Sequence, residues 1–258
     1  MSEQRVPILV YHHVYPDDML ATCESLSGII GQSEFQRQME YIAQEGWQVI
    51  SMTAVLDWLT RKRVVPDRAV AMNFDNGWLD TRTVTMPIMQ EFGMKATCYV
   101  ITDGLEAASA GRSQSVRTQT EGVVERPFMD WDHARELLDA NWEIGAHTAT
   151  HCKMTDKHAA GGDQAVLWEI ETSNAIIEKR LGLAVDHFAY PSGSRSIRID
   201  ELLAPYYRSL RLWHCEFPIQ WSFTDHATSR LAIDCQNVDA RVSFEDFKRI
   251  FTDAQELQ

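Results

Sequence analysis

Several polar side chains suited to hydrolytic chemistry stand directly after short apolar runs of the sequence. His147 and His151, in the stretch HTATH, are four residues apart and follow the run EIGA. On one helical turn both imidazoles would face the same way, an arrangement that suits a divalent metal bound through nitrogen. Asp75 and Asn76 follow another such run, AVAMNF. Two further clusters, YHH and YPSG, occupy residues 11–13 and 190–193.

A metal ion held by two histidines keeps positions open for water, and zinc lowers the pKa of its bound water to about 7. A neighbouring carboxylate, here Asp75, would then act as the general base. Each signal also has a structural interpretation. A chain with nine histidines contains spaced pairs by chance, and an aspartate after a strand commonly closes a turn. The occurrence of both at strand ends favours a metal-dependent hydrolase.

Alternating strand-like and helix-like segments must position these residues. The apolar segments predict strands at residues 6–11, 47–51, 69–74, 96–101, 143–146, 187–190, 210–213 and 230–234. The amphipathic segments predict helices at residues 33–44, 53–62, 84–92, 130–141, 164–181, 199–208 and 244–251. A capping box of Ser33 and Gln36 is expected to open the first helix. This order predicts a mainly parallel sheet covered by helices, either a barrel or a doubly wound sheet, with functional groups at the carboxyl ends of the strands.

Composition places the chain among globular proteins with one large α/β domain or two small ones. Of its 258 residues 45% are hydrophobic and 24% charged, and the net charge is −13. That acidity argues against nucleic acid or an anionic membrane as a partner. The five cysteines are odd in number and form no CxxC, which predicts reduced thiols. Residues 103–127 are small, polar and irregular, and are interpreted as a surface insertion forming a lid or substrate lip.

The N-terminal segment MSEQRVPILVYHHV has no long apolar stretch, so no secretory signal is predicted. No run of about 18 apolar residues occurs, so no membrane span is predicted either. If Met1 is the natural start, the expected location is the cytoplasm.

Three segments resemble the motifs of the polysaccharide deacetylase family, which has the NodB homology domain and forms carbohydrate esterase family 4. NFDNG resembles the family's TFDDG motif, and FAYPSG resembles its third motif. Between them, MDWDHARELLDANWEIGAHTATH resembles the metal-binding block. The likeness runs from about residue 6 to residue 251. It implies an α/β fold, an irregular (β/α) barrel of seven or eight strands, as a single domain over residues 1–258.

The resemblance implies metal-dependent hydrolysis of N-acetyl, sometimes O-acetyl, groups on an N-acetylated oligo- or polysaccharide, such as an exopolysaccharide or its precursor. His147 and His151 would be metal ligands, Asp75 the base, and Asn76 would occupy the place of a third ligand that is aspartate in the family. An amide brings no charge, so either metal binding is weaker or Asp75 itself coordinates. Zinc is the expected metal, with cobalt, nickel and manganese left open.

The opening segment VPILVYHHV is similar to a permuted subgroup, the poly-N-acetylglucosamine deacetylases, whose acid comes from the N-terminal strand. The resemblance therefore implies that His12 protonates the departing amine. Two alternatives remain: His12 or His13 only caps a buried strand, or His214 supplies the acid, as in unpermuted members of the family.

The resemblance also suggests substrate contacts by Trp131, Tyr190, Pro191 and Ser192, with the backbone N–H near Ser192 holding the oxyanion. Ser192 replaces a tyrosine of the family motif, and Ala189 stands where many members have an arginine that orients the catalytic aspartate. Two other functions stay open, the first because of Asn76 and the second because relatives of this fold perform it. One is a weak or inactive homologue that binds sugar. The other is hydrolysis of a different C–N bond, as in cyclic amides or ureides.

Overall fold

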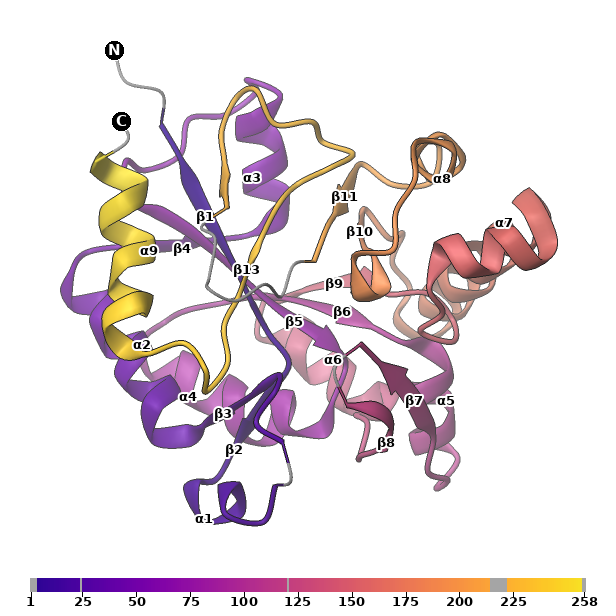
Figure 1. Ribbon diagram of the computed structural model, residues 1–258, viewed down its shortest axis with the longest axis horizontal. Coiled ribbons are helices and arrows are strands. Elements are labelled where there is room, and N and C mark those ends of the chain that lie inside the picture. The colour runs from indigo at the N-terminus through magenta and orange to yellow at the C-terminus, as the bar shows by residue number, and fades with distance from the viewer. Residues whose placement is uncertain (1–3, 24, 120, 214–221, 257–258) are drawn as a thin grey trace.

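A curled, mainly parallel sheet forms the centre of the computed structural model, which describes residues 4–23, 25–119, 121–213 and 222–256 (Figure 1). In this part of the chain the sheet runs in the order β11-β10-β9-β6-β5-β1-β12, with β13 paired to β1 and β4 to β5. Its strands are β1 (Val6–Tyr11), β4 (Gln48–Ile50), β5 (Ala69–Asn76), β6 (Thr97–Val100), β9 (Glu143–Ala146), β10 (His187–Ala189), β11 (Ser209–Arg211), β12 (Phe223–Thr224) and β13 (Gln236–Asn237). Only the β1–β12 pair among them is antiparallel.

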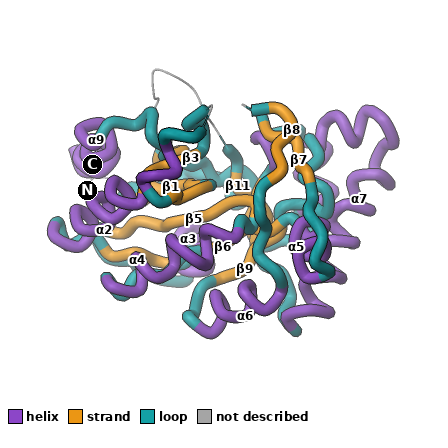
Figure 2. The backbone as a smooth tube through the Cα atoms, turned by 90° about the horizontal axis from the view of Figure 1, so that it is seen from below, coloured by secondary structure: helices purple, strands orange, loops and turns teal. Residues whose placement is uncertain are grey.

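Helices surround this sheet, as Figures 1 and 2 show from two directions. They are α1 (Asp17–Leu20), α2 (Gln32–Gln44), α3 (Met52–Leu59), α4 (Met86–Glu91), α5 (Thr102–Ser109), α6 (Trp131–Asp139), α7 (Met154–Leu181), α8 (Ile197–Leu203) and α9 (Phe244–Glu256). A π-helical turn, η1 (Thr81–Thr85), precedes α4, and a 3-10 turn, η2 (Pro191–Gly193), follows β10. Among the described residues, no helix combines the length and the apolar character that crossing a membrane needs.

Strand β1 is buried along its whole length, and its alternating side chains join two apolar clusters. Val6, Ile8 and Val10 belong to the cluster that includes side chains of α3. Leu9 and Tyr11 belong to the larger cluster, on the other face of the strand. Because successive side chains of a strand point to opposite faces, a strand covered on both faces has to be apolar throughout.

The two edges of the curled sheet are joined by residues 230–238. Leu212, just after β11, donates its N–H to the carbonyl of Ile233 (2.8 Å), and Val238 donates to the carbonyl of Val10 in β1 (2.8 Å). The expected architecture, an α/β barrel of the NodB type, is therefore confirmed. The strand expected at 230–234 is wrong, because these residues form only an isolated bridge, and the strand here is β13.

Two helix starts also differ from expectation. The N-cap of α2 is Gly31, without a side-chain cap, and the hydroxyl of Ser33 instead donates to the carboxylate of Asp17. The predicted capping box is thus wrong, because α1 brings an aspartate to the start of the helix. Helix α7 begins at Met154, before the expected start at residue 164, with a non-helical backbone at Gly162 between its two parts.

The segment 103–127 is more ordered than its composition suggested. It contains most of α5 and a hairpin of β7 (Ser115–Thr118) and β8 (Gly122–Glu125), which lies beside α5 at the carboxyl ends of the central strands (Figures 1 and 2). A second small sheet pairs β2 (His13–Tyr15) with β3 (Ile29–Gly31). Both small sheets add residues to the wall of the pocket described below.

His187 begins β10, at the amino end of the strands, and is buried in a polar network. Its Nδ1 lies 2.7 Å from the hydroxyl of Ser209, and its Nε2 lies 3.0 Å from the hydroxyl of Thr53. Burial lowers the pKa of this imidazole below its ordinary value. The charged groups that act on it are Glu143, Asp186 and Asp57, which raise the pKa, and Arg208, which lowers it.

This burial predicts a loss of stability in acid. Because the folded-state pKa of His187 lies below the unfolded value of about 6.5, the unfolded chain binds more protons as the pH falls. The free energy of unfolding should therefore decrease as the pH is lowered from about 6.5, and His187 should contribute up to about 1.4 kcal/mol of this decrease per pH unit. Urea titrations at pH 7.5 and 5.5 should show that His187→Asn loses less free energy of unfolding between these pH values than the wild type does. The same change at the partly exposed His158 is the control, and equal losses in both variants would contradict the prediction.

Candidate active site

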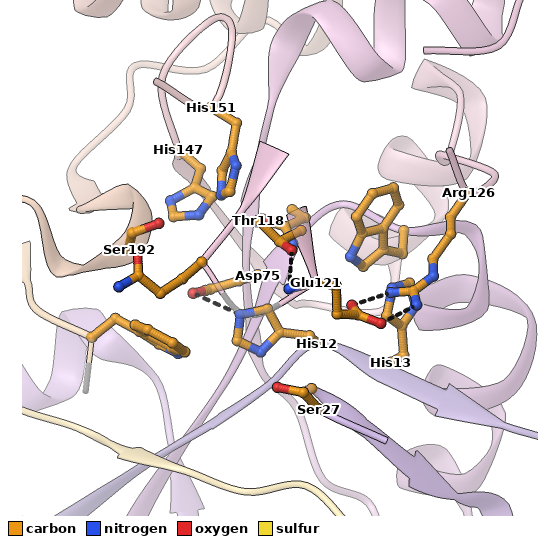
Figure 3. Close-up of a pocket in the computed structure, with 15 residues that line it drawn as sticks. His12, His13, Ser27, Asp75, Thr118, Glu121, Arg126, His147, His151 and Ser192 are labelled. Atoms are coloured by element: carbon orange, nitrogen blue, oxygen red, sulfur yellow. Dashed lines mark hydrogen bonds and ion pairs between the residues drawn. The ribbon is translucent and has the colours of Figure 1, made fainter. Parts of the chain in front are cut away.

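The carboxyl ends of the central strands surround a cavity that opens to solvent (Figure 3). Seven residues named from the sequence line it, namely His12, His13, Asp75, Asn76, His147, His151 and Ser192. Several other lining residues had no predicted role in the site, among them Ser27, Trp78, Thr118, Glu121, Arg126 and Trp213. Parallel strand order is what gathers residues so far apart in sequence at one place.

His147 and His151 lie side by side, with ring centroids 5.0 Å apart (Figure 3). Nδ1 of His147 is 2.8 Å from the carbonyl oxygen of Ala189, and Nδ1 of His151 is 2.8 Å from that of Arg117. A carbonyl oxygen only accepts, so in each ring Nδ1 carries the hydrogen and Nε2 keeps its lone pair. Burial, opposed by the Asp75 carboxylate, lowers the pKa of His147 to about 3, and burial also lowers that of His151. Both rings are therefore neutral near pH 7, as metal ligands must be.

The two histidines do not share a helical turn, contrary to the expectation from their spacing. Residues 147–151 form a loop in which Thr148 (φ 66°) and His151 (φ 61°) have left-handed backbone. The loop is anchored by Glu169 of α7, a fully buried carboxylate that accepts the N–H groups of Ala149 and Thr150, each at 3.1 Å. This carboxylate was missed because it lies in a helix whose sequence suggested an exposed polar face.

The contact to Arg117 comes from β7 of the hairpin, so the inserted segment takes part in the site. Its carbonyl fixes the hydrogen position on His151 from a point 34 residues away in sequence. Partners that orient a metal-binding imidazole in this way also tune its basicity. No sequence signal could have found this contact, because every residue type has a backbone carbonyl.

Asn76 ends β5 with a left-handed backbone (φ 80°), a conformation that asparagine adopts more readily than most residues. Its side chain is 2% exposed, and its Oδ1 has no hydrogen-bond partner within the described part of the chain. A buried, unpaired amide oxygen beside two imidazoles fits a divalent cation, which takes oxygen and nitrogen ligands. The described residues contain no group of three or more His, Cys, Asp or Glu arranged for a metal, so such a site would depend on this amide.

Asp75 is held by an arginine that the sequence analysis did not identify. Arg211 of β11 forms an ion pair with Oδ1 of Asp75, and both side chains are buried. Its guanidinium also lies 4.8 Å from the ring centre of Tyr99. Burial alone would raise the pKa of Asp75, but Arg211 and the neighbouring histidines hold it below its ordinary value. The carboxylate is thus ionised at neutral pH and fixed in one orientation.

The position of Arg211 explains one departure from the family motifs. Ala189, where many members have an orienting arginine, is the register partner of Arg211 across the β10–β11 pair. The guanidinium therefore reaches the aspartate from the adjacent strand. The available signal was the charged residue in the apolar run SLRLW, since a charge inside a buried strand requires a partner.

His12 faces the same carboxylate from the end of β1, with 4.0 Å between its Nε2 and Oδ2 of Asp75 (Figure 3). Burial lowers the pKa of His12 to about 4, although the Asp75 carboxylate opposes this shift. The ring contacts Trp213 edge-on at a centroid distance of 6.0 Å. The alternative acid, His214, lies outside the described residues.

Ser192 lies in η2 on the rim of the cavity, and its backbone is left-handed (φ 54°). The next residue has to be glycine: a Cβ on Gly193 would lie 2.3 Å from the carbonyl oxygen of Trp213. This close approach fixes the turn against the segment that follows β11. It holds the backbone of Ser192 at the cavity.

The structure does not place three other expected substrate contacts at the cavity. Trp131 is 5% exposed and donates its indole N–H to Glu106 (2.7 Å), within the packing between α5 and α6. The hydroxyl of Tyr190 donates to Asp200 (2.7 Å), and Pro191 is buried in η2. Their substrate contacts stay predictions; in the structure the three side chains support the walls of the site, because their rings complete the apolar core or its buried hydrogen bonds.

Comparisons with known proteins agree with this geometry. Residues 62–206, more than half of the chain, match the sequence profile of polysaccharide deacetylase. YxkH of Bacillus subtilis (strain 168), which carries a polysaccharide deacetylase name, is 26% identical over 150 residues, 58% of this chain and 44% of that protein. The poly-β-1,6-N-acetyl-D-glucosamine N-deacetylase of Escherichia coli (strain K12) is 23% identical over 117 residues, 45% of this chain and 17% of that protein.

The chain thus spans less than half of the length of these two relatives. A solved structure, the Streptococcus pyogenes deacetylase PplD in complex with acetate, has the same fold, with a TM-score of 0.78 at 19% identity. The match covers 97% of this chain and 99% of that one. Together with the profile match, the shared fold shows that this chain belongs to the polysaccharide deacetylase family.

Proposed function

We propose that this protein is a metal-dependent deacetylase that removes N-acetyl groups from an N-acetylated oligo- or polysaccharide. The observation that carries the proposal is the single pocket in which two neutral histidines and an unpaired amide oxygen lie beside a buried, arginine-held carboxylate. A polymer of N-acetylglucosamine is the proposed substrate, because the Escherichia coli relative is named for that activity.

His147, His151 and Asn76 would hold the metal, which supplies Lewis acidity and a water of lowered pKa when bound. Asp75 accepts the proton of the attacking water, and Arg211 keeps this carboxylate ionised and oriented. The backbone at Ser192 supports the developing oxyanion.

His12 gives a proton to the nitrogen as the C–N bond breaks, which yields acetate and a free amino sugar. Since burial keeps His12 neutral near pH 7, its proton has to arrive during the reaction. The nearest source is the carboxylate of Asp75, whose Oδ2 is 4.0 Å away. The proton taken from water therefore returns to the leaving amine within one pocket.

The test is acetate release by purified protein loaded with zinc, cobalt, nickel or manganese in turn, with metal content measured in parallel. Substrates would be N-acetylglucosamine oligomers, O-acetylated sugars and cyclic amides. Acetate from the oligomers supports the proposal. A fully loaded protein that releases acetate from no sugar would refute it, and opening of a cyclic amide would identify the alternative C–N hydrolase.

Asn76→Asp is expected to tighten zinc binding by about tenfold or more, because a carboxylate adds negative charge where the amide has none. The left-handed backbone at this position accepts aspartate as well as asparagine. Competition with a chelator of known affinity gives the dissociation constant. Asn141→Asp is the matched control, since Asn141 also has a positive φ (61°) but lies at the exposed end of α6. Equal affinities for wild type and Asn76→Asp would show that residue 76 is not a ligand.

A further inference from the structure

The cavity has a second half that the proposed chemistry does not use. In Figure 3, His13 and Arg126 lie on the opposite side of the cavity from Ser192. Arg126 forms a two-fold ion pair with Glu121, with N–O distances of 2.7 and 2.9 Å. Arg126 and Glu121 thus satisfy each other. His13 and the neighbouring Trp78, in contrast, each have a buried ring nitrogen without a hydrogen-bond partner among the described residues.

The hydrogen position on His13 is fixed by Asp80. Nδ1 of the imidazole lies 2.8 Å from Oδ1 of Asp80, while Oδ2 accepts the backbone N–H of Val14 at 2.9 Å. An ionised carboxylate only accepts, so Nδ1 carries the hydrogen. In the neutral ring Nε2 is then an acceptor, and it is the unpaired atom of a side chain that is 2% exposed.

Trp78 provides the complementary group. Its indole stacks on His13, with ring centroids 4.8 Å apart and planes at 23°, and it is 1% exposed. Its unpaired Nε1–H can only donate. A buried acceptor and a buried donor thus stand on two stacked rings that both line the cavity.

The chemistry of this pair restricts its ligand. A hydroxyl group carries both functions on one oxygen, because it can donate to Nε2 of His13 and can accept from Nε1 of Trp78. A carboxylate has no hydrogen for the imidazole, and an ammonium group has no lone pair for the indole. The pair therefore selects a neutral hydroxyl over either charged group.

We propose that His13 and Trp78 form a subsite that binds one hydroxyl group of the sugar substrate, with Asp80 as a positioning residue. This inference rests on the proposed function, since it takes a sugar as the substrate. A buried donor or acceptor without a partner is costly, so a site built around a hydroxyl rejects analogues that lack it. The subsite therefore contributes selectivity for sugars over simple acetyl esters.

Trp78→Phe removes the donor and keeps an aromatic ring. With zinc-loaded protein, we expect KM for N-acetylglucosamine oligomers to rise about tenfold, with kcat within about twofold, as for the loss of one strong hydrogen bond. The ratio of kcat/KM for the oligomer to that for phenyl acetate, which has no hydroxyl, should fall by a similar factor. Trp142→Phe is the matched control, because Trp142 also has a buried, unpaired Nε1 but does not line the cavity.

Asp80→Asn tests the hydrogen position without removing a ring. The amide can donate to Nδ1, which moves the imidazole hydrogen to Nε2 and converts the acceptor into a donor. We expect the same loss of selectivity as for Trp78→Phe. Binding of oligomers that lack single hydroxyls would identify the group, since the matching deoxy sugar should bind wild type and Trp78→Phe equally.

If Trp78→Phe changes kcat/KM for the oligomer and for phenyl acetate equally, the subsite is refuted. The two nitrogens would then only stabilise the fold or bind a fixed water molecule. Failure of the proposed function gives a different result: the wild type hydrolyses phenyl acetate but releases no acetate from sugar. In that case calorimetric titration of the oligomer decides the subsite separately. No binding to the wild type, or equal dissociation constants for wild type and Trp78→Phe, would reject it.

Discussion

Arg211→Met is expected to lower the free energy of unfolding by about 3–5 kcal/mol, the usual loss when one member of a buried ion pair is removed. Asp75 is only 1% exposed and would keep a buried charge without its partner, or take up a proton at the expense of its proposed role as a base. Acetate release should fall with it. Urea unfolding measures the first effect, and turnover at saturating zinc measures the second.

The double variant Asp75→Asn/Arg211→Met should recover most of the lost stability, because neither charge then remains buried. Arg198→Met is the surface control, since Arg198 pairs with Asp163 where both side chains are largely exposed, and the unfolding midpoint should hardly move. If the double variant is as unstable as Arg211→Met alone, the ion pair does not account for the loss.

Asp75→Asn is expected to lower kcat by about 10²- to 10⁴-fold, the usual contribution of a general base. An amide cannot take the proton of the attacking water, whereas the proposed ligands His147, His151 and Asn76 are unchanged. Zinc content should therefore stay near the wild-type value while acetate release is lost. Steady-state kinetics on N-acetylglucosamine oligomers, with metal content measured on the same samples, tests both statements.

Asp163→Asn, the same chemical change on the surface, should leave kcat at the wild-type value. A wild-type kcat for Asp75→Asn would remove this residue from the chemistry. Loss of zinc from this variant would point instead to direct coordination by Asp75. The two outcomes distinguish whether Asp75 acts as a base or as a metal ligand. The question arises in this chain because Asn76 stands where the family has an aspartate ligand.

The side chains of the predicted acid, His12, and the predicted base, Asp75, differ in how many partners hold them in place. Asp75 has an arginine on one oxygen and His12 near the other. His12 has no partner on its buried Nδ1 within the described ranges. Its basicity therefore depends on burial and on Asp75, so that a change at residue 75 should alter both proton transfers at once.

The main strands could be predicted because a strand buried on both faces has to be apolar throughout. Strands β1 and β9 have the expected bounds, and β5 begins where it was expected. Since parallel strands end at the same edge of a sheet, the residues after them had to meet. His12, Asp75 and His147 could therefore be expected in one site without knowledge of any contact between them.

Contacts between distant segments could not be predicted in the same way. Arg211 reaches Asp75 because β10 and β11 pair in one particular register, and His151 is fixed by a carbonyl of an inserted hairpin. The same limit applies to the direction of single side chains. Trp131 matched a family position, yet it packs between two helices, since side-chain direction depends on neighbours that a linear pattern does not identify.

The sequence by itself thus determined the candidate reactive groups of this protein and the strand ends that carry them, because apolar periodicity is a local property of the chain. Only the tertiary structure decided which nitrogen of each histidine is available, which cation holds the proposed base, and which buried atoms have no partner among the described residues. Those properties arise from hydrogen bonds between residues 20 to more than 100 positions apart, and such bonds exist only once the strands have taken their register.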